Sequence, residues 1–477
     1  MKTVIGRKSE KATLKKYIES DKAEFIVVYG RRRVGKTFLI RQMFGSDFAF
    51  EVSGTINGKK DEQMVNFIQA LKRFGYDGTK NPKTWYEAFE LLQELLEPKI
   101  KRQEPCIIFI DELPCFDTQK ARFITAFDHF WNGWASHYSN IKLIVCGSAT
   151  SWMVNNIIDN HGGLHNRITH EMHLKPFCLA EAEEYFKEYG FGWNRLSVLH
   201  AYMVFGGIPY YYSLLDNKYS LSQNIDNVFF KTDGEIRREY DRLFKSLFTT
   251  PDPYMQVIKI LAEKKQGMSR DDIAAKAKLT NNGHLTKILN NLVNCDFIRR
   301  FNTREKKIKS NAHLYQLTDL FVLFHHTFSK LDTTDENFWS NSLGTSRMNS
   351  WFGLAYERVC MLHIPQIKQS LGIDRIHTEY YSWKIKTSTP AAQIDLIIDR
   401  ADQLINVCEV KYSEYPYSID KGEDARLRTR ISNFIEETAT QKGINLTFIT
   451  TYGVKQNQYS DIVRNEITMD DLFEEKR

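Results

Sequence analysis

The stretch "EFIVVYGRRRVGKTFLIRQMF", residues 24–44, decides the fold of the N-terminal part of the chain. Its apolar and β-branched first part predicts a buried strand, and its last part, "FLIRQMF", predicts a helix. Between them, "GRRRVGKT" fits the pattern G-x-x-x-x-G-K-[ST] in the strand–loop–helix context that this pattern requires. The sequence therefore predicts a loop that wraps a phosphate chain and leads directly into a helix.

The residue types in this loop suit a nucleotide. Gly30 and Gly35 allow the backbone to approach phosphates closely, so that successive N–H groups and the helix N-terminus face the anion. Lys36 is expected to reach the β- and γ-phosphates, and Thr37 to bind Mg²⁺. The other residues expected to line the nucleotide are Arg31, Arg32, Arg33, Val34 and Phe38. For the three arginines, the alternative is a solvated rim around the phosphate site.

Two further apolar strands are predicted downstream, and each ends in polar residues. In "CIIFIDEL" (106–113), Asp111 is expected to hold Mg²⁺ through water, and Glu112 to orient or deprotonate the attacking water. In "IKLIVCGSAT" (141–150), Ser148 is placed to sense the γ-phosphate or the water, or else it simply ends the strand as a turn residue. ATP and Mg²⁺ are therefore the expected cofactors.

These strands, in this order, resemble the AAA+/STAND-type P-loop ATPases. The runs "YGRRRVGKT", "FIDE", "CGSAT" and "GGIPYY" (206–211) are similar to a prokaryotic ATPase family with a DUF234-type C-terminal region, over nearly the whole chain. The resemblance implies that Gly207-Ile208-Pro209 links nucleotide state to domain arrangement; the alternative is an ordinary turn between helices. It also implies that Arg167 approaches the γ-phosphate of its own or a neighbouring subunit in a homo-oligomer, although Asn166 stands where family members often carry Gly.

The middle of the chain is basic, because residues 251–330 contain 14 Lys and Arg against 7 Asp and Glu. Three helical patterns, one with Ser269 as its N-cap, precede the predicted strands "FIRRF" and "HLYQL". Three helices and a hairpin predict a winged helix, with DNA or another nucleic acid as its partner. The side chains expected to contact phosphates are Arg299, Arg300, Arg304, Lys306, Lys307 and Lys309. The alternative is a module that serves only for packing and has a solvated basic surface.

The C-terminal part is predicted to contain a helix (352–371) followed by three strands, the last two being "AAQIDLIIDR" (391–400) and "LINVCEVKYS" (404–413). Strand alternation places Glu409 and Lys411 on the same face. The order of these elements resembles the PD-(D/E)xK nuclease superfamily. That resemblance implies Asp395 and Glu409 as metal ligands, Lys411 as the catalytic lysine, and Glu357 as support from the helix. The alternative is a salt bridge between Glu409 and Lys411.

The expected architecture is an α/β multidomain protein. Its parts are an AAA+-like P-loop NTPase core (1–170), a helical subdomain (171–250), a winged helix (251–320), a helical linker (321–349) and an α/β/α restriction-endonuclease-like domain (350–477). No apolar run reaches the roughly 18 residues that a bilayer span needs, so no membrane contact is expected. Seven scattered cysteines without a CxxC pair predict reduced thiols in the cytoplasm.

Two functions fit these expectations. The first is an ATPase that couples nucleotide state to a winged helix and a nuclease-like domain acting on nucleic acid. The second is a slow regulatory switch or scaffold of the STAND type, whose nuclease-like domain binds but does not cut.

Overall fold

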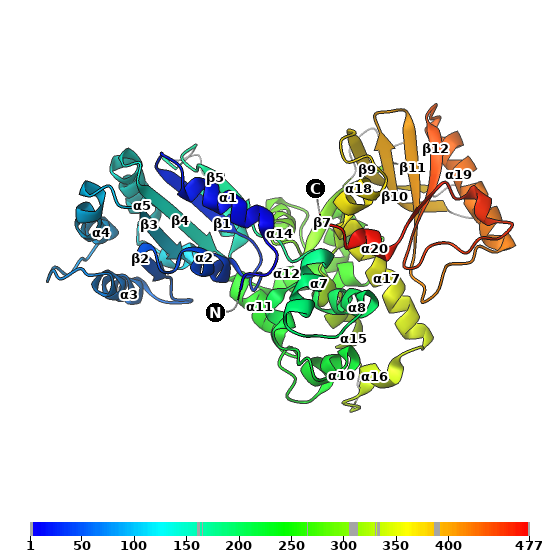
Figure 1. Cartoon of the computed structure of the whole chain (residues 1–477), viewed down its shortest axis with the longest axis horizontal. Coiled ribbons are helices and arrows are strands. Elements are labelled where there is room, and N and C mark those ends of the chain that lie inside the picture. Colours follow the sequence, from blue (N-terminus) through cyan, green and yellow to red (C-terminus); the bar gives the residue numbers. More distant parts are fainter. Residues whose placement is uncertain are drawn as a thin grey trace. The chain divides into compact units, whose positions relative to one another are not determined.

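The computed structural model describes residues 3–159, 163–164, 166–264, 266–304, 313–329, 331, 334–385 and 392–475. These residues belong to two compact units, Met1–Pro176 and Phe177–Arg477, and each is described by itself (Figure 1). Among the described residues, no helix is long and apolar enough to cross a membrane.

A five-stranded parallel sheet of order β2-β3-β4-β1-β5 forms the centre of the first unit. Its strands are β1 (Glu24–Tyr29), β2 (Phe48–Ser53), β3 (Cys106–Asp111), β4 (Ile141–Gly147) and β5 (His170–His173). The strands predicted from the sequence are β1, β3 and β4, whereas β2 and β5 were not predicted. Because all five run in one direction, their carboxyl ends meet at one edge, where ligands of such sheets bind.

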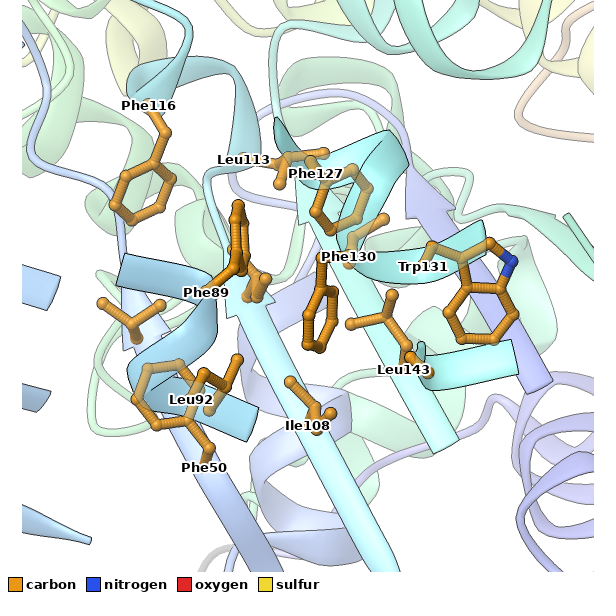
Figure 2. Packing of buried hydrophobic residues seen from close by; sticks show 14 of the residues in the cluster. Phe50, Phe89, Leu92, Ile108, Leu113, Phe116, Phe127, Phe130, Trp131 and Leu143 are labelled. Carbon is orange, nitrogen blue, oxygen red and sulfur yellow. The ribbon is translucent and has the colours of Figure 1, made fainter. Parts of the chain in front are cut away.

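The helices of the first unit pack aromatic side chains against this sheet. They are α1 (Lys8–Ile18), α2 (Lys36–Phe44), α3 (Lys60–Arg73), α4 (Trp85–Lys101), η1 (Leu113–Phe116), α5 (Phe123–Gly133), η2 (Ala135–His137), α6 (Thr150–Met153) and the π-helix η3 (Val154–Ile158). Figure 2 shows Phe89 of α4 and Phe130 of α5, whose rings stack at 4.9 Å, close to Ile108 and Leu143 of the strands. Residues that point to the other face, such as Ile144, are also buried, as expected for a parallel sheet.

The second unit begins with helices. They are α7 (Leu179–Glu188), α8 (Arg195–Phe205), α9 (Pro209–Tyr212), α10 (Leu221–Ile225), the π-helix η4 (Asp226–Phe230) and α11 (Glu239–Leu247). Gly206 and Gly207 separate α8 from α9 with φ angles of 68° and 69°. A Cβ atom on Gly207 would lie 2.4 Å from the carbonyl oxygen of Phe177. Both the left-handed backbone and this close approach therefore require glycine at position 207.

Three helices and a hairpin follow in the order predicted for the basic segment. The elements are α12 (Asp252–Ala262), β6 (Met268–Ser269), α13 (Arg270–Ala277), α14 (Gly283–Asn294), β7 (Ile298–Arg304) and β8 (His313–Leu317). The predicted N-cap is confirmed, since Ser269 Oγ accepts a 3.1 Å hydrogen bond from the N–H of Asp272. Lys306, Lys307 and Lys309 lie outside the described residues, and the side chain of Arg304 is not described either.

The remaining elements complete the second unit. They are α15 (Leu320–Phe328), α16 (Phe338–Ser342), α17 (Ser346–Leu362), α18 (Ile364–Ser370), β9 (Thr378–Ile385), β10 (Ala392–Arg400), β11 (Leu404–Lys411), α19 (Lys421–Thr438), β12 (Gly443–Thr450), η5 (Ser460–Ile462), β13 (Asn465–Ile467) and α20 (Met469–Leu472).

One eight-stranded sheet, of order β13-β12-β11-β10-β9-β7-β8-β6, runs through the second unit. Strand β7 of the hairpin pairs in parallel with β9, with Thr303 opposite Ser382. The sequence predicted a winged helix and a C-terminal sandwich on either side of a linker at 321–349. The sheet instead includes strands from both sides of that linker, because β7 pairs with β9. The hydrophobic periodicity of a single strand does not indicate which distant strand it will pair with.

Helices α17 and α19 cover opposite faces of the C-terminal strands. Val407 of β11 packs with Leu427 and Phe434 of α19 in one apolar cluster. Cys408, the next residue, points to the other face because strand side chains alternate, and α17, which carries the buried Cys360, packs against β11. Each face of β11 is therefore covered by a different helix.

Candidate functional site

The loop between β1 and α2 has the backbone that its glycines predict. Gly30 and Gly35 adopt φ angles of 141° and 95°, and a Cβ atom on Gly30 would lie 2.3 Å from the carbonyl oxygen of Leu174. Lys36 is buried within the loop, and its Nζ donates to the carbonyl oxygens of Gly30 at 2.8 Å and Arg31 at 3.0 Å. To reach a phosphate, the ammonium group exchanges these neutral acceptors for a charged one.

Asp111 ends β3 beside this loop and accepts hydrogen bonds at both carboxylate oxygens. Thr37 Oγ1 donates to Oδ2 at 2.9 Å, Ser53 Oγ lies 3.4 Å from the same oxygen, and the N–H of Glu112 donates to Oδ1 at 3.0 Å. Burial, and then the charge of Glu112, raise the pKa of Asp111, while the bond from Thr37 opposes this shift. A carboxylate and hydroxyl oxygens at one point match the ligands that Mg²⁺ prefers.

Glu112 has an unusual backbone and a fixed carboxylate. Its φ of 46° and ψ of 48° are left-handed, which costs a residue other than glycine about 1–3 kcal/mol. The N–H of Ser148, at the end of β4, donates to Oε2 at 3.1 Å, and the Ser148 hydroxyl donates to Oε1. Ser148 therefore does more than end a strand, because its N–H and hydroxyl engage both oxygens of the Glu112 carboxylate.

The three arginines of the loop differ from one another. Arg31 is 2% exposed, so the solvated-rim interpretation does not describe it, whereas Arg32 and Arg33 are half-buried. Arg33 adopts a left-handed φ of 73° within the turn. Phe38 is 41% exposed on the first turn of α2. The loop thus combines one buried cation with two that reach solvent.

Sequence reasoning missed Arg7. This residue is 4% exposed, and its Nη2 donates at 3.4 Å to the carbonyl oxygen of Val34 in the phosphate loop. It precedes α1 with a left-handed φ of 55°, directly after Gly6 at 58°. A Gly-Arg pair before an amphipathic helix was the available signal, but the sequence does not show which loop the arginine would contact.

Arg167 is exposed, and the residue before it has a left-handed backbone. Asn166 adopts a φ of 58°, in the left-handed region that glycine favours. Asparagine tolerates that region better than most residues, so Asn166 preserves the turn that a glycine would form. The proposed approach of Arg167 to a γ-phosphate stays a prediction.

In the second unit, Glu409 lies within an ion-pair network. Its Oε1 is 3.0 Å from Lys411 Nζ, and its Oε2 is 2.5 Å from Nη1 of Arg430 on α19. Lys411 Nζ is also 3.0 Å from Oε1 of Glu423, whose other oxygen accepts from the Tyr417 hydroxyl. Burial alone would lower the pKa of Lys411, but the charge and hydrogen bond of Glu409, together with the charges of Tyr417 and Glu423, outweigh burial and raise that pKa. The predicted salt bridge is thus present, within a larger network.

The other two predicted ligands lie elsewhere. A bulge in β10 between Ile394 and Ile397 contains Asp395, which is exposed and accepts a 2.5 Å bond from Gln393 Nε2. Glu357 lies 3.8 Å from the guanidinium of Arg358. Within the described residues, no three His, Cys, Asp or Glu side chains form a group that could hold a metal. The structure therefore does not gather Asp395, Glu409 and Glu357 into one metal site.

The α19 partners of this network, Arg430 for Glu409 and Glu423 for Lys411, were not predicted as site residues. Glu423 and Arg430 are seven positions apart, which is two helical turns, so both lie on the helix face toward β11. This spacing was visible in the sequence. What was missing was the placement of α19 against β11, which depends on tertiary packing.

With this geometry in place, the chain can be compared with known proteins. Residues 5–215 match the model of a family described as an ATPase domain predominantly from Archaea. Residues 5–215 are therefore similar to an ATPase domain, and this match supports ATP binding and hydrolysis by those residues. An uncharacterized protein of Methanocaldococcus jannaschii is 25% identical over 365 residues, which cover 74% of this chain and 76% of the relative.

The solved structures to which the chain is similar include two archaeal proteins. A Walker-type ATPase of Pyrococcus abyssi is 18% identical, with a TM-score of 0.49 over 68% of this chain and 96% of that chain. The ORC2 protein of Aeropyrum pernix, in ADPNP and ADP complexes, is 12% identical, with a TM-score of 0.40 over 67% of this chain and 92% of that chain.

Proposed function

We propose that the first unit binds ATP with Mg²⁺ and hydrolyses it at the carboxyl edge of its sheet. Bound Mg²⁺ would neutralise charge on the β- and γ-phosphates. Thr37 and Asp111 hold it, the loop N–H groups between Gly30 and Lys36 bind the phosphates, and Glu112 removes a proton from the attacking water. The observation that carries this proposal is the 2.9 Å bond from Thr37 to Asp111, because it joins the phosphate loop to the acid that would hold the metal.

The experiment is a measurement of ATP turnover by the full chain with Mg²⁺. Turnover should require the metal and should be lost in Asp111→Asn, with Asp117→Asn as the matched control. Asp117 is another carboxylate of this unit with a raised pKa, but it accepts from the Trp152 indole away from Thr37. Turnover that persists in Asp111→Asn would contradict the assigned role of this carboxylate.

We infer further that the second unit acts on nucleic acid. The order α12–α13–α14–β7–β8 supports the proposed winged helix, whose third helix exposes His284 and Lys287. Arg270 stabilises the turn before α14, because its guanidinium donates to Asn281 Oδ1 at 2.6 Å and to the carbonyl oxygen of Asn282 at 2.8 Å. A salt-dependent affinity for DNA or RNA that falls in Lys287→Ala would agree with this role.

A nuclease-like fold for the C-terminal part is also proposed. Antiparallel β9-β10-β11 followed by parallel β12 and β13, with α17 and α19 on opposite faces, supports an α/β/α arrangement. If this part cuts, the full chain with Mn²⁺ should degrade single- or double-stranded DNA or RNA, and Asp395→Ala should not. Absence of cleavage across these substrates would contradict a nuclease.

The second candidate function is a slow regulatory switch or scaffold of the STAND type that binds without cutting. Two observations favour it. The carboxylate of Glu112 is engaged by Ser148, and both oxygens of Glu409 face cations rather than other acids. A switch predicts slow hydrolysis and an ATP-dependent change in oligomer size. Fast turnover stimulated by nucleic acid, without any change in size, would exclude it.

A further inference from the structure

The first three residues of the second unit, Phe177–Leu179, are called the junction segment here because they follow Pro176, the last residue of the first unit. The N–H of Phe177 donates to the carbonyl oxygen of Gly207 at 2.7 Å, and the Tyr202 hydroxyl donates to the carbonyl oxygen of Phe177 at 2.8 Å. Both backbone polar groups of Phe177 are therefore held by α8 and by the break that follows it.

His363 ties the same segment to α17. The N–H of Leu179 donates to Nε2 of His363 at 3.0 Å, and Nδ1 of His363 lies 2.8 Å from the carbonyl oxygen of Val359. Because Nε2 accepts, the ring proton is on Nδ1 and donates to Val359. The ring is 1% exposed, and burial lowers the pKa of His363 to about 4, so the imidazole is neutral near pH 7. This one ring thus connects the junction segment to the last turn of α17.

Helix α17 is joined in turn to the ends of β11 and β12. The Tyr356 hydroxyl donates to the carbonyl oxygen of Thr450 at 2.8 Å. The Phe352 ring stacks on His200 at 4.3 Å and on Tyr412 at 5.2 Å, and His200 Nε2 lies 2.7 Å from the Tyr412 hydroxyl. Tyr412 directly follows β11, the strand that ends in the ion-paired Lys411. Contacts therefore run without a gap from Leu179 to the end of β11.

We propose that His363 is a positioning residue through which a shift of the junction segment moves α17 and, through Tyr412, the end of β11. The inference rests on the proposed ATP binding, since Pro176 connects the nucleotide-binding unit covalently to Phe177. A shift of the segment either carries α17 with it or leaves the buried N–H of Leu179 without its acceptor. The second outcome is unfavourable because a buried donor without a partner loses its hydration and gains nothing.

The test is hydrogen–deuterium exchange on the full chain, with and without a non-hydrolysable ATP analogue and Mg²⁺. In the wild type, exchange in α17 and β11 should change by about fivefold or more on nucleotide binding. In His363→Leu that change should disappear while the analogue still binds. In His363→Gln the change should remain, because the side-chain amide oxygen can accept from Leu179.

Two further variants separate coupling from folding. His325→Leu is the matched control, because His325 is also a largely buried histidine of the second unit but lies on α15, stacked on Tyr240. It should keep the full response. Tyr412→Ala removes both the ring that stacks on Phe352 and the hydroxyl that pairs with His200, so α17 should still respond while β11 should respond less, and this variant also tests the inference if His363→Leu does not fold.

The possible results lead to different conclusions. If the analogue binds and α17 does not respond in the wild type, or if His363→Leu responds fully, the inference is overturned while ATP binding stands. If the wild type binds no nucleotide, the proposed function is wrong and the inference fails with it.

Discussion

Thr37 Oγ1 donates a 2.9 Å hydrogen bond to Asp111 Oδ2, although 74 positions separate the two residues. The bond connects the first turn of α2 to the end of β3. Parallel pairing of β1 and β3 with β4 brings these two ends to one edge, so the fold itself creates the contact. A magnesium site built in this way has one oxygen ligand on the phosphate loop and one on the central sheet.

Replacing Lys36 with Ala should lower ATP turnover by at least about 100-fold, because a charged donor aimed at the β- and γ-phosphates is lost. Titration of a fluorescent ATP analogue together with phosphate release would measure affinity and turnover. Lys72→Ala, at an exposed lysine on α3, is the control and should behave like the wild type. Equal turnover in the two variants would contradict the role of Lys36.

Glu112→Gln should keep nucleotide affinity and lower hydrolysis by about 10²–10⁴-fold, because the amide cannot take a proton from water. Single-turnover kinetics with isotopically labelled ATP would separate binding from hydrolysis. Glu97→Gln, on the exposed side of α4, should have no effect. A variant at position 112 that binds ATP weakly and hydrolyses it normally would show that the acid contacts the nucleotide and not the water.

Ser148→Ala should raise basal hydrolysis about two- to fivefold, because Glu112 loses one of the two bonds that engage its carboxylate and becomes more available to water. The backbone N–H of residue 148 still donates, which keeps the effect modest. Steady-state turnover without nucleic acid would measure it. A decrease would show instead that the serine hydroxyl holds the acid in its productive orientation.

Acid should destabilise the second unit through three of its histidines, of which His363 is buried and His200 and His325 are half-buried. Burial lowers the pKa values of His200, His325 and His363 to about 4, whereas an unfolded chain titrates near 6.5. Their stabilising contribution is complete above pH 6.5 and is lost as the pH falls toward 4, because the unfolded chain then binds more protons. Each histidine should lower the free energy of unfolding by about 1–2 kcal/mol between pH 7 and pH 5.

Urea unfolding at pH 7 and pH 5, followed by exchange in peptides of the second unit, would measure this loss. His363→Gln cannot titrate and should show a smaller difference between the two pH values. An unchanged difference would mean that folding does not shift the pKa of His363.

Arg430→Met should increase the affinity of the C-terminal part for Mn²⁺, because the carboxylate of Glu409 then loses one of its two cations. Calorimetry on the full chain with Asp111→Asn as background would remove the contribution of the first unit. Arg428→Met, on the same helix but paired with Asp424, is the control and should bind Mn²⁺ like its parent. Equal affinities would show that no metal approaches Glu409.

The phosphate loop was predictable because its residues are contiguous. Only one strand, one turn and one helix are needed to position Gly30, Gly35, Lys36 and Thr37. The sequence pattern specifies all three of these elements. The acids of β3 were also predictable, since an apolar strand ending in Asp-Glu has meaning once a phosphate loop precedes it. The pairing of Ser148 with Glu112 could not be predicted, because it depends on how β3 and β4 lie beside each other.

The C-terminal acids show which contacts sequence patterns can predict and which they cannot. Strand alternation correctly placed Glu409 beside Lys411. It assumed regular strands, however, whereas β10 has a bulge between Ile394 and Ile397 that contains Asp395. Arg430, which pairs with Glu409, lies on α19, and the position of this helix depends on tertiary packing. Sequence spacing therefore predicted the pair formed by Glu409 and Lys411 on β11. It did not predict how residues of β10, β11 and α19 lie relative to one another.

The parallel pairing of β7 with β9 limits how the chain can be divided for expression. A fragment beginning near residue 346 would leave β9 as an open edge, and its buried Tyr381 and Trp383 would lie next to unpaired backbone N–H and C=O groups. Such an edge invites pairing with another copy and aggregation. A piece that keeps the eight strands together must include at least the chain from Met268 of β6 to Ile467 of β13, whatever activity a shorter fragment is meant to isolate.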